Sequence, residues 1–145
     1  MDAYLGIRYK LSKSENFEEY MKALEESNGN VNFLGVGLVV RKMGNAMTPI
    51  VSLTLADGVY TLTTSTTFKN QVITFKPEEE FEEETLDGRK VKSKVSFDGN
   101  KMTQIQKDDK GNVITTIVRE FKKDQMETIL TAGNVVCTRI YDKVE

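Results

Sequence analysis

The sequence predicts a mainly β protein in which an antiparallel up-and-down meander closes into a barrel. From Thr48 onward, short runs of β-branched and aromatic residues alternate with turn signals, most of them spaced at roughly 10 to 13 residues. Helical periodicity is confined to the region before Thr48, so no second layer of helices is available to cover an open sheet. Closure removes the sheet edges, which favours a barrel. The turn signals are Asp57–Gly58, Lys69–Asn70, Asp87–Gly88, Asp98–Gly99, Lys110–Asn112, Lys123–Asp124 and Gly133–Asn134.

One strand and two short helices are expected before this β region. Apolar residues alternate with lysines over Tyr4–Ser14, which predicts a first strand. Asn16–Glu19 resembles a capping box, and it opens a helix that ends near Glu26. The apolar face of this helix consists of Phe17, Tyr20, Met21 and Leu24. A second helical pattern stops at Gly44–Asn45 and is formed by Val36, Val39, Val40 and Met43.

Length and composition restrict the class of protein. A chain of 145 residues is long enough for one core, so we expect a single domain over residues 1–145. The net charge of -2 gives no basic surface for nucleic acid, and the absence of histidine removes the commonest metal ligand and general base. The single cysteine, Cys137, cannot form an internal disulfide, and no signal peptide or membrane-spanning run is evident. We therefore expect a soluble cytoplasmic protein without metal or cofactor.

Two strands near the C-terminus each carry an arginine in phase with apolar residues. Arg139 shares a face with Cys137 and Tyr141, and Arg119 shares one with Ile117 and Phe121. A buried guanidinium group is costly without an anion, and neither strand offers an acid on that face. The residues alone leave two interpretations open: an internal site for an anionic ligand, or mixed faces with exposed arginines.

Five segments of the chain also carry a specific resemblance to a known family. They are Asn16–Lys22, Ser65–Asn70, Asp87–Ser93, Val118–Glu120 and Cys137–Tyr141. With them, essentially the whole chain resembles the intracellular lipid-binding proteins of the calycin superfamily, and within these the heart and muscle type of fatty acid-binding protein. The resemblance implies a ten-stranded β-clam around a large cavity. It also implies a helix-turn-helix lid over about residues 16–43, between the first two strands.

The resemblance further implies an internal ligand site. In the muscle-type branch two arginines and a tyrosine hold the carboxylate of a fatty acid, and Arg119, Arg139 and Tyr141 match them in identity and spacing. The helix residues expected to contact the ligand or its portal are Phe17, Tyr20 and Met21. The other expected ligand-binding residues are Pro49, Thr64, Phe68, Arg89, Ile117 and Leu130.

This resemblance implies a non-enzymatic, monomeric carrier of long-chain fatty acids, with transient membrane contact through the lid. A retinoic acid carrier of the same family is the main alternative, because retinoic acid also presents a carboxylate. An enzyme on a similar barrel is disfavoured because no histidine can activate Cys137 or another nucleophile. A membrane-stacking protein would need a basic surface, which the acidic balance does not provide.

Three features depart from the family pattern. The usual tryptophan of the first strand is missing, and Tyr9 is expected to fill its place. About ten additional residues, over about 25–34, separate the first helix from Gly35-Val36-Gly37. The run Glu78–Glu84 is unusually acidic, and we expect a solvated face and turn there rather than a calcium site, because consecutive strand residues point to opposite faces.

Overall fold

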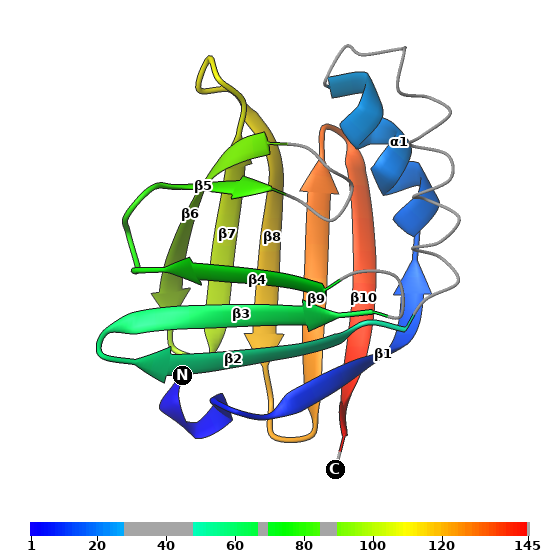
Figure 1. Ribbon diagram of the computed structural model, residues 1–145. Coiled ribbons are helices and arrows are strands. Elements are labelled where there is room, and N and C mark those ends of the chain that lie inside the picture. The colour runs from blue at the N-terminus through cyan, green and yellow to red at the C-terminus, as the bar shows by residue number, and fades with distance from the viewer. Residues whose placement is uncertain (28–47, 67–69, 85–89, 145) are drawn as a thin grey trace.

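The computed structural model describes residues 1–27, 48–66, 70–84 and 90–144, and this part of the chain contains ten antiparallel strands and one α-helix (Figure 1). The helix α1 (Phe17–Ser27) lies between the first two strands, after a 3-10 turn at Asp2–Tyr4. The strands are β1 (Arg8–Glu15), β2 (Ile50–Ala56), β3 (Val59–Ser65), β4 (Asn70–Phe75), β5 (Phe81–Glu84), β6 (Lys90–Asp98), β7 (Lys101–Lys107), β8 (Val113–Phe121), β9 (Gln125–Ala132) and β10 (Val135–Val144). The predicted ten-stranded barrel is confirmed. The second predicted helix and residues 28–34 of the insertion lie outside the described residues.

The strands follow one another around a nearly closed barrel. The sheet order is β4-β3-β2-β1-β10-β9-β8-β7-β6-β5, so neighbours in sequence pair directly and β1 joins β10 to complete the meander. Strands β2 to β4 cross steeply in front of β6 to β10, and these two groups form the two walls of the clam (Figure 1). The described parts of β4 and β5 end the order without pairing with each other. Among the described residues, the backbone ladder is therefore interrupted between β4 and β5.

The turn between β2 and β3 shows how the predicted turn residues set the register. Ala56 pairs with Val59, so only Asp57 and Gly58 form the loop. Their φ angles are 52° and 79°, and such a two-residue hairpin loop favours positive φ because it must match the twist of its strands. Aspartate followed by glycine tolerates this conformation at low cost, as the sequence predicts.

The first strand begins four residues later than its expected start at Tyr4. Asp2–Tyr4 forms a 3-10 turn and Gly6 has a φ of 80°, so the strand begins only at Arg8. Tyr9 is fully buried, as the missing tryptophan would require, and its hydroxyl donates to the carbonyl of Lys122 at 2.8 Å. The register with β10 then shifts between Leu11 and Lys13. This bulge changes the pairing of the second half of the strand with β10.

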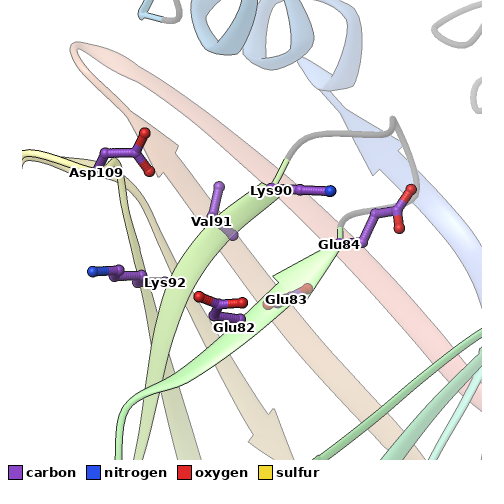
Figure 2. A pocket seen from close by; sticks show the side chains of 7 residues that line it. All are labelled: Glu82, Glu83, Glu84, Lys90, Val91, Lys92 and Asp109. Carbon is purple, nitrogen blue, oxygen red and sulfur yellow. The ribbon is translucent and has the colours of Figure 1, made fainter.

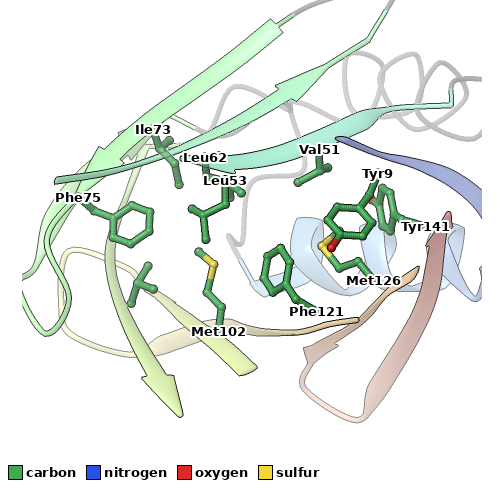
Figure 3. Close-up of a cluster of buried hydrophobic side chains, with 11 residues drawn as sticks. Tyr9, Val51, Leu53, Leu62, Ile73, Phe75, Met102, Phe121, Met126 and Tyr141 are labelled. Carbon is green, nitrogen blue, oxygen red and sulfur yellow. The ribbon is translucent and has the colours of Figure 1, made fainter. Parts of the chain in front are cut away.

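Buried apolar side chains form two clusters at different heights of the barrel. The larger cluster joins β1 to β4 with β6 to β10 and includes Tyr9, Leu53, Phe75, Met102 and Phe121 (Figure 3). The second cluster lies beneath α1. It combines the helix residues Tyr20, Met21 and Leu24 with Val91, Ile114, Ile117, Leu130, Ala132 and Cys137. The helix therefore covers β8 to β10, on the side where both arginines of interest lie.

Candidate functional site

Both arginines project from one row of residues that crosses three adjacent strands. Arg119 of β8 pairs with Thr128 of β9, and Thr128 pairs in turn with Arg139 of β10. Paired residues of antiparallel strands lie roughly 4.5 to 5.5 Å apart, so the Cα atoms of the two arginines are about 10 Å apart. Antiparallel register thus brings together two cations that are twenty residues apart in the sequence.

Arg139 lies almost wholly inside the barrel and beneath the first residue of α1. Its side chain is 8% exposed, and its Cζ atom lies 4.1 Å from the centroid of the Phe17 ring. A guanidinium group over an aromatic face gains cation–π attraction without losing its charge. Its Nε atom has no hydrogen-bond partner within the described part of the chain. The helix therefore holds the guanidinium in place, and one of its donors remains available.

Arg119 is half-buried and is oriented by an amide of the neighbouring strand. Its Nη1 atom donates to Oε1 of Gln104 at 3.1 Å, whereas its buried Nε atom has no partner among the described residues. Burial lowers the pKa of Arg119 from its ordinary value, and the nearby Tyr141 and Glu83 oppose that shift. Arginine stays protonated in proteins, so the site keeps its positive charge.

Tyr141 completes the trio that the sequence predicted. It follows Arg139 by two residues on the same strand, points inward and is 6% exposed. The trio therefore lies on the inner wall of β8 and β10, which resolves the sequence alternatives in favour of inward arginines.

The other predicted ligand-binding residues divide into three groups. Tyr20 and Met21 of α1 are buried over the barrel, and the Tyr20 hydroxyl makes a 2.7 Å hydrogen bond with Oγ1 of Thr115. Four further residues are buried along the barrel wall or at its rim, namely Pro49, Thr64, Ile117 and Leu130. Phe68 and Arg89 lie outside the described residues. No described contact assigns a ligand to any of these side chains.

Glu83 is an interior residue that the sequence analysis missed. The acidic run is exposed at Glu78–Glu80, Glu82 and Glu84, as predicted, but Glu83 is only 7% exposed. Its Oε1 atom accepts hydrogen bonds from Ser93 at 2.7 Å, Gln104 at 2.7 Å and Gln106 at 3.3 Å. Its Oε2 atom accepts one from Gln71 at 3.1 Å. Four donors compensate for the burial of this carboxylate. Glu82 and Glu84 lie on the solvated face that the sequence predicted, whereas Glu83 lies on the opposite, inner face.

The hydrogen bonds of Glu83 connect two parts of the barrel. Gln104 donates to Glu83 and accepts from Arg119, so one amide links the interior carboxylate to the arginine row. Gln71 belongs to β4 and Glu83 to β5, so their bond crosses the opening between these strands. The phase of Glu83 with Phe81, and the paired glutamines on the inner face of β7, are the sequence signals that could have identified this network.

One described pocket, of about 300 Å³, lies at the β5–β6 hairpin rather than at the arginine row (Figure 2). Four carboxylates and two lysines line it, together with Val91: Glu82, Glu83, Glu84, Asp109, Lys90 and Lys92. The lining of this pocket therefore carries a net negative charge, in contrast to the two cations of the arginine row.

Three further observations concern membrane-spanning helices, metal ligands and the cysteine among the described residues. No helix among them is long and apolar enough to cross a membrane. They also contain no group of three or more cysteine, aspartate and glutamate side chains arranged to hold a metal ion. Cys137 is fully buried, and burial raises the pKa of its thiol to about 11, so at neutral pH it is a poor nucleophile.

A ten-stranded antiparallel clam with a helix between its first two strands and cations on its inner wall defines a calycin-type lipid-binding barrel. The chain belongs to the Lipocalin / cytosolic fatty-acid binding protein family, whose model matches residues 5–144. This is a family of lipid-binding carriers and not of enzymes.

Individual relatives are similar in sequence or structure to nearly the whole chain. A muscle fatty acid-binding protein of Schistocerca gregaria is 47% identical over 140 residues, which cover 95% of each chain. The crystal structure of a fatty acid-binding protein in brain tissue of Drosophila melanogaster has 55% identity and a TM-score of 0.82, covering 96% of this chain and 98% of that one. A Schistosoma mansoni fatty acid binding protein in complex with arachidonic acid has 42% identity and a TM-score of 0.85, and the match covers 100% of this chain and 98% of that one.

Proposed function

We propose that this protein binds one long-chain fatty acid inside the barrel and carries it through the cytoplasm as a monomeric, single-domain carrier. The observation that supports this most strongly is the inner row in which Arg119 and Arg139 each have an Nε donor without a partner in the described part of the chain. In the proposal the ligand carboxylate binds Arg119, Arg139 and Tyr141. The similar Schistosoma mansoni protein in complex with arachidonic acid supports the same ligand class.

The acyl chain supplies most of the binding free energy. Each buried methylene contributes about 0.8 kcal/mol, so a long chain contributes on the order of 10 kcal/mol as an upper bound. A charge-assisted hydrogen bond contributes only roughly 1.5–3 kcal/mol net. The arginines therefore select an anionic headgroup and fix its orientation, whereas the apolar wall determines the overall affinity.

The remaining predicted residues are proposed to contact the tail. Phe17, Tyr20 and Met21 form the underside of α1, and the barrel side chains beneath them include Ile117 and Leu130. Pro49 and Thr64 would extend this lining towards β2 and β3. We further propose that the outer face of α1 touches membranes transiently during transfer, with its exposed residue Lys22 near acidic headgroups.

The arginine site can be tested by titration calorimetry with oleate. Arg139→Leu and Arg119→Gln should each weaken binding by about 10- to 100-fold, because each removes one charge-assisted partner. Arg8→Leu is the matched control, since Arg8 is exposed on β1 and should leave affinity unchanged. Equal oleate affinity in all three variants would contradict the internal anion site. Retinoic acid, tested as a competitor, distinguishes the two carboxylate ligands that the family resemblance implies.

A further inference from the structure

Thr128 lies between the two arginines, on the inner face of β9. It pairs with Arg119 on one side and with Arg139 on the other, and its side chain is 2% exposed. Its hydroxyl has no hydrogen-bond partner within the described residues. Buried hydroxyls without partners are uncommon because each loses its bonds to water without replacement. The position therefore requires an explanation beyond packing.

The same row contains two more buried donors without a partner among the described residues, the Nε atoms of Arg119 and Arg139. Three such polar groups therefore occupy paired positions on the inner face of three adjacent strands, which supports a hydrogen-bonding role towards a ligand at this row. Guanidinium groups only donate, whereas a threonine hydroxyl can donate once and accept twice. The inner-face neighbours of Thr128 along β9 are Met126 and Leu130, whose side chains offer no oxygen acceptor.

We propose that Thr128 is a fourth headgroup-binding residue beside Arg119, Arg139 and Tyr141, whose hydroxyl donates its proton to the ligand carboxylate between the two guanidinium groups. This inference rests on the proposed fatty-acid function and specifies the ligand further. The charges of the two cations favour an orientation in which the hydroxyl oxygen faces the guanidinium groups and the O–H bond faces the anion. The site then offers an ionised carboxylate two charged donors and two neutral ones, the hydroxyls of Thr128 and Tyr141, and it discriminates against an alcohol of the same chain length.

The test compares Thr128→Val, which has the same shape without the hydroxyl, with Thr128→Ser, which keeps the hydroxyl. Oleate affinity should fall about tenfold in Thr128→Val, whereas Thr128→Ser should stay within about threefold of the parent. Oleyl alcohol should lose less than about threefold in Thr128→Val. Thr54→Val is the control for the chemical change, since Thr54 is exposed on β2, and it should bind oleate like the parent.

Stability separates a ligand contact from a structural role. Thr128→Val removes the desolvation cost of a buried hydroxyl that has no partner among the described residues. The melting temperature of the ligand-free variant should therefore not fall below that of the parent. Unchanged oleate affinity in Thr128→Val, an equal loss for oleate and oleyl alcohol, or a clear drop in melting temperature would each overturn the proposal. If the arginine variants weaken oleate binding and Thr128→Val does not, only the role of Thr128 fails. If the parent does not bind oleate, the proposed function fails with it.

Discussion

Replacing Glu83 by glutamine should lower the stability of the protein and raise its affinity for fatty acid. Four donors converge on the two carboxylate oxygens of Glu83, and the glutamine amide keeps only one oxygen. If that oxygen stays with Ser93, Gln104 and Gln106, the new amino group faces the amino group of Gln71. Gln71 cannot rotate freely, because its Nε2 atom also donates to the Glu84 carbonyl at 2.7 Å.

The size of the stability loss follows from the hydrogen bond between Gln71 and the buried Glu83 carboxylate, which the variant loses. We expect a loss of about 1–3 kcal/mol in the free energy of unfolding. For a chain of this length that corresponds to a melting temperature lower by roughly 3–9 °C. Oleate affinity should rise a few-fold, because Glu83 lies near Arg119 and its negative charge opposes an incoming carboxylate.

Thermal unfolding and calorimetry of Glu83→Gln, with Glu82→Gln as control, measure both effects. Glu82 is the exposed neighbour on the same strand, so its exchange removes the same charge from the outer face. The control should change stability by less than about 0.5 kcal/mol. If the two variants are equally stable, or if Glu83→Gln binds oleate more weakly, the assignment of Glu83 as a buried hydrogen-bond hub and rival charge is incorrect.

Three other measurements probe the same interior. Oleyl alcohol should bind the parent protein at least about tenfold more weakly than oleate, because it leaves two guanidinium groups without a counter-charge; equal affinities at neutral pH in calorimetry would place the headgroup elsewhere. Burial, together with the nearby Tyr4 and Asp124, raises the pKa of Tyr9 from 10 to about 12. The neutral hydroxyl therefore contributes its full amount to the free energy of unfolding below pH 10. That contribution should be lost between pH 10 and 12 and be missing in Tyr9→Phe; identical alkaline unfolding curves for the two proteins would count against it. Cys137 should react with a thiol reagent at pH 8 far more slowly in the folded protein than in urea, since it is buried with a raised pKa; similar rates would show that the second cluster is open to solvent.

Local chemistry was sufficient to predict most of the architecture. Asp57–Gly58, Asp98–Gly99 and Gly133–Asn134 each have a glycine with positive φ at a hairpin, so the turn residues located the strand ends. Alternation along β10 also predicted that Cys137, Arg139 and Tyr141 share one face, and in the structure this face is buried. These predictions succeed because turn geometry and strand phase depend on residues that are adjacent in sequence.

Features that depend on distant partners could not be predicted in the same way. The phase of Glu83 with Phe81 indicates only which face it shares. Its burial depends on Gln71, Ser93, Gln104 and Gln106, which three other strands supply. Thr128 likewise becomes notable only when register places it between two arginines. The roles of the ligand-binding residues remain predictions, since they concern a molecule outside the chain.

The opening between β4 and β5 has a consequence for behaviour at high concentration. An unpaired strand edge is a template for pairing with a second copy of the chain, and β4 also exposes Val72, whose side chain is 59% accessible. The opposite edge is short and carries the exposed charges of Glu82 and Glu84, while the Gln71 side chain already occupies the Glu84 carbonyl. Like charges and an occupied backbone acceptor hinder edge-to-edge stacking. The barrel can therefore leave β4 and β5 unpaired with each other without promoting the formation of fibrils.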